Sequence, residues 1–224
     1  MMKYLFSTIV MCSLLVLVAP FAFAGEQSWS FEADAADWTP ANGAWSVEDG
    51  TYKLAKGGRA EHSLVGEVGW EDYTVEAKVR LDEGNWAGVV FRAQGEMEYY
   101  VYYLNVPNNK TELWRHKEGA WDARDKIGEL AGTNVTIANG EWFDMRVVVE
   151  DVSMKLWING EDQGELKDET GAGYAAGQAG VWAWETAASF DDVKVSGDEI
   201  VGGETPVEPQ GKLTTTWGRI KQRL

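Results

Sequence analysis

The stretch YTVEAKVRL, Tyr73 to Leu81, decides the fold class of this chain. Apolar residues stand at every second position, so Val75 and Val79 lie on one face and Lys78 lies on the other. A β-strand places successive side chains on opposite faces, whereas an α-helix repeats every 3.6 residues. We therefore predict a strand with one buried face and one solvated face.

The same alternation recurs on both sides of this stretch. In WFDMRVVVE, 142–150, we expect Phe143 and its alternate neighbours to face a core, and VSMKLWING, 152–160, repeats the pattern before an Asn-Gly turn signal. Glycine-punctuated segments of this kind continue from Trp29 to Val195 without a convincing helical period. Short strands at such spacing predict an antiparallel sandwich or barrel.

The first 24 residues differ from the rest of the chain. Residues 1–24 combine Lys3, a short apolar run and a small-residue ending, Ala22-Phe23-Ala24, which predicts a secretory signal peptide cleaved after Ala24. The apolar run is too short to remain as a membrane span. The single cysteine, Cys12, lies inside this leader. We therefore expect a secreted protein, extracellular or periplasmic, whose mature part has no disulfide.

The remaining residues divide into three parts. We predict one β domain over 25–196 and a polar linker rich in Gly and Pro over 197–211. Residues 212–224 place Leu213, Trp217 and further apolar residues at helical spacing among four basic ones, which predicts a basic amphipathic tail. We expect this tail to dock to a membrane surface or a protein, and a frayed terminus is the alternative.

The charge of the chain limits its partners. The sequence contains 36 acidic and 20 basic residues, for a formal net charge of −16. Such a surface repels nucleic acid and anionic lipid, so we exclude both as partners of the main domain.

The order of several motifs from one end of the domain to the other resembles a known superfamily. These motifs are SFEADAADW (30–38), WEDYTVEAKVRL (70–81), NWAGVVFRA (85–93), YYVYYLN (99–105), GQAGVWAW (177–184) and SFDDVKV (189–195). Their succession over about residues 28–196 resembles the concanavalin A-like, laminin G-like jelly roll. The resemblance implies an all-β fold in which two curved antiparallel sheets pack face to face.

Members of this superfamily include carbohydrate-binding modules, glycoside hydrolases, 3-keto-disaccharide hydrolase domains and adhesive modules, so the fold leaves the function open. The hydrolases carry Glu-x-Asp-x-Glu or a close variant, which is absent here. No metal-binding or phosphate-binding motif is present either, and His62 and His116 are far apart in the sequence. WSVEDG, 45–50, resembles the 3-keto-disaccharide hydrolase branch, so a hydrolase acting on modified sugars remains one alternative and an adhesive protein-binding module another. We favour a binding module over an enzyme.

Aromatic residues support carbohydrate as the ligand. All twelve tryptophans follow the leader. A pyranose ring has an apolar face and a polar rim, so sugar sites pair flat aromatic rings with a few polar groups. Strand alternation predicts an outward-facing trough on the concave sheet, and a sheet merely covered by loops is the alternative. The expected ligand-binding residues are Arg92, Tyr100, Tyr102, Trp114, His116, Trp157, Trp182 and Trp184.

The last strand of the domain raises the question of a metal. Phe190 and Val193 are both expected in the core although they are three residues apart, which predicts a bulge at Asp191-Asp192. In related jelly-roll modules such aspartates bind a structural calcium, so the resemblance implies Glu32 and Asp192 as ligands, with Asp191 as a substitute for Asp192. The alternative is a solvated acidic edge that discourages pairing between sheets.

Overall fold

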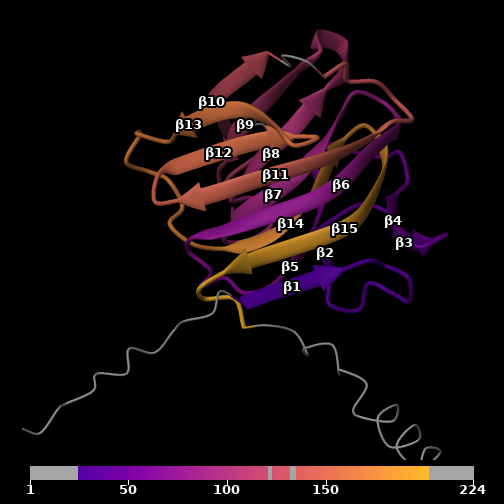
Figure 1. The fold of residues 1–224 in the computed structure, drawn as a ribbon, viewed down its shortest axis with the longest axis horizontal. Coiled ribbons are helices and arrows are strands. Elements are labelled where there is room, and N and C mark those ends of the chain that lie inside the picture. Colours follow the sequence, from indigo (N-terminus) through magenta and orange to yellow (C-terminus); the bar gives the residue numbers. More distant parts are fainter. Residues whose placement is uncertain (1–24, 121–122, 132–134, 202–224) are drawn as a thin grey trace, which may run out of the picture.

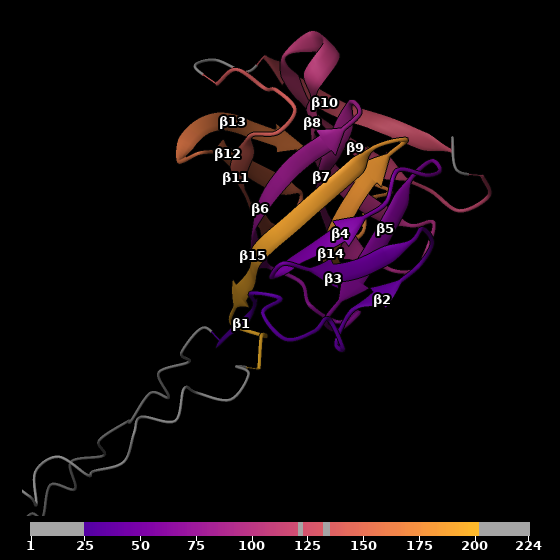
Figure 2. The same cartoon turned by 90° about the vertical axis from the view of Figure 1, so that its right-hand side faces the viewer.

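The computed structural model describes residues 25–120, 123–131 and 135–201. Two antiparallel sheets pack face to face (Figure 1, Figure 2), which confirms the predicted all-β jelly-roll sandwich. The described helical structure is one short 3-10 turn, η1 (Val106–Asn108). No helix in the described ranges is long and apolar enough to span a membrane. The predicted leader, 1–24, and tail, 212–224, lie outside the described residues.

The first sheet has eight strands in the order β13-β12-β11-β6-β15-β4-β3, and β1 pairs with β15 beside this path. The strands are β1 (Gly25–Trp29), β3 (Trp45–Glu48), β4 (Thr51–Leu54), β6 (Tyr73–Glu83), β11 (Trp142–Glu150), β12 (Ser153–Ile158), β13 (Glu161–Lys167) and β15 (Ala187–Gly197). Along β6, buried and half-buried residues alternate as predicted, and one face is solvated.

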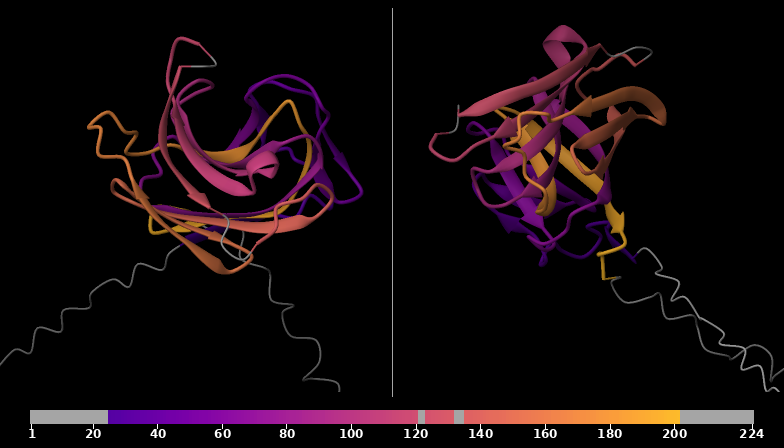
Figure 3. Two further views of the ribbon diagram at one scale, coloured as in Figure 1. Left: turned by 90° about the horizontal axis from the view of Figure 1, so that it is seen from above. Right: turned by 90° about the vertical axis from the view of Figure 1, so that its left-hand side faces the viewer.

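The second sheet has seven strands in the order β10-β9-β8-β7-β14-β5-β2. They are β2 (Thr39–Pro40), β5 (Glu61–Val65), β7 (Trp86–Ala93), β8 (Tyr99–Asn105), β9 (Lys110–His116), β10 (Arg124–Ala131) and β14 (Gln178–Trp184). Seen from above, this sheet is strongly curved, and its hollow side faces away from the other sheet (Figure 3, left). We call this hollow side the concave face.

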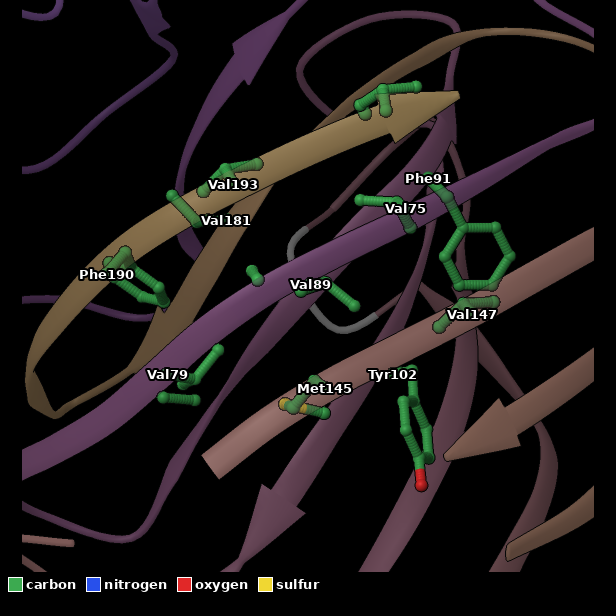
Figure 4. Packing of buried hydrophobic residues seen from close by; sticks show 14 of the residues in the cluster. Val75, Val79, Val89, Phe91, Tyr102, Met145, Val147, Val181, Phe190 and Val193 are labelled. Carbon is green, nitrogen blue, oxygen red and sulfur yellow. The ribbon is translucent and has the colours of Figure 1, made fainter. Parts of the chain in front are cut away.

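The core lies between the two sheets. Val75 and Val79 of the first sheet meet Val89 and Val181 of the second, and all four side chains are fully buried (Figure 4). Full burial of such a side chain contributes about 1.5–3 kcal/mol relative to exposure. This contribution explains why alternation on β6 and β11 is so regular: a shift of one residue would move every core side chain into water.

The seven-stranded sheet departs from simple alternation because both of its faces are covered. Every residue of β8 is buried. One set of its side chains joins the core, and the other joins a second cluster on the concave face with Val90, Leu64 and Trp182. A strand of this kind has no solvated face, so its sequence does not show which residues point toward the core.

The last strand contains the predicted bulge and continues further than expected. The register of β15 against β6 shifts between Asp191 and Lys194, and Asp192 has a φ of 44°, which confirms a bulge there. Beyond β15, Ile200 is buried in the core cluster and its amide donates a hydrogen bond to the Gly197 carbonyl. Ile200, which falls in the predicted linker, is therefore packed on the domain, whereas Asp198, Glu199 and Val201 are exposed.

Candidate functional site

The concave face carries a groove lined mainly by aromatic side chains. It has a volume of about 250 Å³. We call it the aromatic groove and define it by Trp86, Tyr103, Asn105, Glu112, Trp114, His116, Arg124, Trp182 and Trp184. These residues come from β7, β8, β9, β10 and β14, which are neighbours in the sheet but span about a hundred residues of sequence.

Stacked rings form the base of the aromatic groove. The Tyr103 and Trp182 ring centroids are 5.1 Å apart with planes inclined by 26°, and the Tyr99 and His116 centroids are 4.5 Å apart with planes inclined by 13°. These four side chains are buried, whereas Trp114 and Trp184 are only half-buried and present part of their surface to solvent. Offset stacking of this kind adds about 0.5–1.5 kcal/mol per pair to the burial of the rings, so the base is rigid.

Glu112 is the polar centre of the aromatic groove. Its carboxylate accepts hydrogen bonds from the Tyr103 hydroxyl and from the Trp114 indole nitrogen at 2.9 Å, and it pairs with the Lys110 ammonium at 2.8 Å. Burial alone would raise the pKa of the Glu112 carboxyl, but the hydrogen bonds from Lys110, Tyr103 and Trp114 outweigh it and lower this pKa to about 2. Glu112 is therefore ionised at neutral pH and fixes the orientation of two groove aromatics.

A side cavity of about 70 Å³ shares His116 with the aromatic groove and is also lined by His62 and Tyr99. Burial lowers the pKa of His62, and burial together with the charges of Arg124 and His62 lowers the pKa of His116 to about 3. Both imidazoles are therefore neutral at pH 7. Since a carbonyl oxygen only accepts, the 2.9 Å contact between His62 Nδ1 and the Ala60 oxygen assigns the proton to Nδ1.

The opposite nitrogen of His62 consequently carries a lone pair. His62 Nε2 is buried and has no hydrogen-bond partner among the described residues. A buried unpartnered acceptor is unfavourable unless water or a ligand supplies a donor. His62 therefore has one buried acceptor without a described partner beside the side cavity.

The structure places four of the eight predicted ligand-binding residues in the aromatic groove: Trp114, His116, Trp182 and Trp184. The predicted facing of Tyr100 and Tyr102 is wrong, since both side chains lie in the core. Their cross-strand partners are Phe91 and Val89, which also face the core, and residues directly opposite in a ladder share a face. The tyrosines on the concave face are instead Tyr103, in the aromatic groove, and Tyr99, in the side cavity.

Arg92 does not line the aromatic groove either. It has a φ of 49° at an irregularity in the pairing of β7 with β14, and its side chain is 2% exposed. The guanidinium donates to the carbonyls of Glu71, Asp151 and Tyr174 and to the Asp72 carboxylate at 2.9 Å. The bulge redirects the side chain from the concave face to these loops, so Arg92 connects three chain segments.

Trp157 belongs to the other sheet, contrary to its predicted place in the trough. It lies on β12 opposite Arg146 of β11, whose guanidinium carbon is 4.8 Å from the indole ring centroid. Trp157 lines a hollow of about 650 Å³ on the outer face of the eight-stranded sheet. That hollow is larger than the aromatic groove, but its charges are paired with one another, as in Lys78–Asp192 and Lys194–Glu76. We therefore place the candidate site in the aromatic groove.

Several residues of the groove and its side cavity were not predicted from the sequence. Trp86, Tyr103, Glu112 and Arg124 line the groove, and His62 lines its side cavity. One signal for the tyrosines was present in YYVYYLN: Leu104 has the same parity as Tyr102, and a buried leucine fits the core better than a polar groove. For Glu112 and Arg124 no local pattern exists, because each acts through strands that are distant in sequence.

The predicted calcium ligands lie near one another at the β15 bulge, where burial and the charges of Asp192 and Glu32 raise the pKa of Asp191. Asp192 pairs with Lys78 at 2.7 Å, and the Glu32 carboxylate lies beside Gly50. Within the described ranges, no group of three or more His, Cys, Asp or Glu side chains is arranged to hold a metal ion. Calcium also takes backbone and water oxygens, so calcium binding at the bulge of β15 stays a prediction.

Comparison with known proteins gives one family match and one curated relative. Residues 29–196 match the family model of the 3-keto-alpha-glucoside-1,2-lyase-like domain. Over 143 residues the chain is 30% identical to an extracellular exo-alpha-L-arabinofuranosidase from Streptomyces chartreusis, and the match covers 62% of this chain. The chain spans only 17% of the length of that relative.

Solved structures with the same fold include two from Bacillus subtilis. The carbohydrate-binding module CBM66 superposes with a TM-score of 0.61 at 18% identity, covering 70% of this chain and 94% of the module. A protein of unknown function with a galectin-like fold gives a TM-score of 0.55 at 11% identity, covering 76% of this chain and 96% of that protein. At such identities the likeness establishes the fold alone.

Proposed function

Because the chain belongs to the 3-keto-alpha-glucoside-1,2-lyase-like domain family, we propose that it is a carbohydrate-binding module whose ligand lies in the aromatic groove. The observation that carries this proposal is the pairing of half-buried tryptophans with a fixed carboxylate. Trp114 and Trp184 offer the CH groups of a pyranose the ring surface that Arg124 leaves exposed, and Glu112 offers lone pairs to the hydroxyl rim.

The polar groups of the site suit the hydroxyl groups of a carbohydrate. Glu112 is ionised and is held by Lys110, Tyr103, Trp114 and Asn105, so it accepts without rotating. His62 Nε2 is a second acceptor, buried beside the side cavity. Hydrogen bonds to a charged acceptor contribute about 1.5–3 kcal/mol. Acceptors fixed before binding need no ordering when the ligand arrives, which favours affinity.

The names of similar proteins point in the same direction. CBM66 is a carbohydrate-binding module, and the curated relative is named as an extracellular exo-alpha-L-arabinofuranosidase. The module proposed here would serve as a carbohydrate-binding or glycoside hydrolase-associated domain. The extracellular relative, together with the predicted leader, supports a secreted protein.

A second candidate, an enzyme acting on 3-keto-glucosides, follows from the description of the family. It would need a general base in the groove, and such a base works best when its pKa lies near the operating pH. The pKa values of His116 and Glu112, about 3 and about 2, make both groups weak bases. This is the physical reason for preferring binding to catalysis.

The experiment that tests the proposal is a glycan array followed by calorimetry on the hits. We expect enthalpy of association without product release for the wild-type protein. Trp184→Ala should weaken binding, because it removes groove surface. Trp157→Ala is the matched control: both tryptophans are half-buried and lie under an arginine, at 4.6 Å from Arg124 and 4.8 Å from Arg146, but Trp157 is on the other sheet.

Three outcomes would contradict the proposal. Turnover of a 3-keto-disaccharide would favour the enzyme. A protein partner without any glycan would favour the adhesive module. Loss of glycan binding in Trp157→Ala, with unchanged binding in Trp184→Ala, would show that the site lies in the hollow around Trp157 on the eight-stranded sheet.

A further inference from the structure

Arg124 is the first residue of β10 and reaches across the concave face. Its guanidinium carbon lies over the ring of Trp114, 4.8 Å from the centroid, and over the ring of Trp184, 4.6 Å from the centroid. Trp114 is on β9 and Trp184 is on β14, three strands further along the sheet. One guanidinium therefore bridges two walls of the aromatic groove.

This cation differs from the others around the aromatic groove in having no carboxylate partner. Lys110 pairs with Glu112 and Glu129 at 2.8 Å, and Arg59 pairs with Glu185 at 2.8 Å. For Arg124, no acidic side chain in the described part of the chain lies within ion-pair distance, 4.0 Å. Among the described residues, a cation without such a partner is unusual, since the chain has 36 acidic and 20 basic residues.

The neighbourhood does not satisfy Arg124 by other means. His62 and His116 are neutral at pH 7, and the Glu112 carboxylate, which Lys110, Tyr103 and Trp114 hold in place, is not within ion-pair distance of Arg124. Contact with an indole ring holds the face of a guanidinium but leaves the N–H groups at its edge able to donate. A guanidinium in this state has the geometry to receive an anion with two oxygens side by side.

We infer that the carbohydrate in the aromatic groove carries an anionic group, a uronic-acid carboxylate or a sulfate ester, and that Arg124 pairs with it through its N–H edge. This inference rests on the proposed function. Carboxylate and sulfate both present paired oxygens to the guanidinium fork. Trp114 and Trp184 orient the guanidinium before the ligand arrives, so little side-chain entropy is lost on binding.

The test uses two pairs of oligosaccharides in titration calorimetry with the whole chain. The first pair is a hexuronate oligomer and its carboxyl-reduced counterpart, and the second is a sulfated oligomer and its desulfated counterpart. We expect one acidic ligand to bind about tenfold more tightly than its neutral counterpart at low ionic strength. The pair that shows the difference identifies the anionic group. The difference should shrink as salt is added.

Three variants test whether this difference in affinity depends on Arg124. Arg124→Met should abolish the preference for the acidic ligand, so that the acidic ligand and its neutral counterpart bind this variant equally, because the charge-assisted pair is lost. Arg124→Lys should keep part of the preference, since the charge remains without the fork. Arg146→Met, which removes the corresponding arginine over Trp157, should leave both affinities unchanged.

The outcomes separate this inference from the proposed function. Equal binding of acidic and neutral ligands, or an equal loss of both in Arg124→Met, would overturn the inference and leave carbohydrate binding standing. Absence of binding to every glycan, acidic or neutral, would overturn the proposed function and the inference with it.

Discussion

Tyr99 and Tyr100 are consecutive residues of β8, yet their rings lie on opposite sides of the sheet. The Tyr99 ring stacks on His116 beside the aromatic groove, with centroids 4.5 Å apart, whereas the Tyr100 ring stacks on Phe91 in the core, with centroids 5.4 Å apart. The Tyr100 hydroxyl also donates to the Asp168 carboxylate at 2.5 Å. Substitutions at the two faces of the sheet should therefore have different consequences.

Tyr100→Ala should lower the free energy of unfolding by about 3–5 kcal/mol, because it leaves a cavity in the core. Glycan affinity of the folded fraction should be unchanged. Urea denaturation and calorimetry measure the two quantities, and Trp184→Ala is the opposite control, with lost affinity and nearly unchanged stability. A Tyr100→Ala protein that is as stable as the wild type but no longer binds glycan would show that Tyr100 belongs to the aromatic groove.

Arg92→Met should destabilise the domain by about 2–4 kcal/mol, because it removes hydrogen bonds from a buried guanidinium to three carbonyls and to Asp72. The chemical denaturation midpoint measures this loss. Lys155→Met is the control, since its surface ion pair with Glu150 at 3.2 Å is exposed and should contribute less than about 1 kcal/mol. Equal effects of the two variants would contradict the role of Arg92 as a connector of loops.

The pKa of Glu112 predicts part of the acid sensitivity of the fold. Its folded pKa, about 2, lies below the ordinary value of 4.5, so its contribution to stability is fully present above pH 4.5 and is lost as the pH falls toward 2. Glu112→Gln lacks this contribution. Between pH 5 and pH 2 the melting temperature of this variant should therefore fall less than that of the wild type. An equal fall in the two proteins would contradict the lowered pKa of Glu112.

Calcium at the bulge of β15 is testable by chelation. If Glu32 and Asp192 share an ion, a chelator should lower the melting temperature and added calcium should restore it, because a ligand of the folded state stabilises it by mass action. Asp192→Asn should remove this response. A melting curve indifferent to chelator and calcium would leave Asp192 as the partner of Lys78 alone.

Truncation tests the end of the domain. A chain ending at Gly197 loses Ile200, which is 3% exposed in the core, and the hydrogen bond from Gln27 to the Val201 carbonyl. It should be about 2–4 kcal/mol less stable than the full chain, on the scale of a buried aliphatic side chain. A chain ending at Val201 should keep full stability and glycan affinity while losing any association with vesicles or proteins. Equal stability of the two chains would place the boundary at Gly197.

The sequence determined the fold class because the relevant signal is local. Along β6, Val75, Ala77 and Val79 alternate with charged residues, and this pattern predicts both the strand and its buried face. The bulge at Asp191-Asp192 was readable for the same reason, since two core residues stood three positions apart. Trp114, His116, Trp182 and Trp184 could be placed on the concave face from the alternation of their own strands.

Only the tertiary structure decided the facing of β8 and the composition of the groove. Both faces of β8 are buried, so polar–apolar alternation does not separate Tyr100 and Tyr102 from Tyr99 and Tyr103, whereas the strands that pair with β8 do. Glu112 and Arg124 gained their roles from side chains on strands distant in sequence, because hydrogen bonds and cation–ring contacts act across a sheet whatever the separation along the chain.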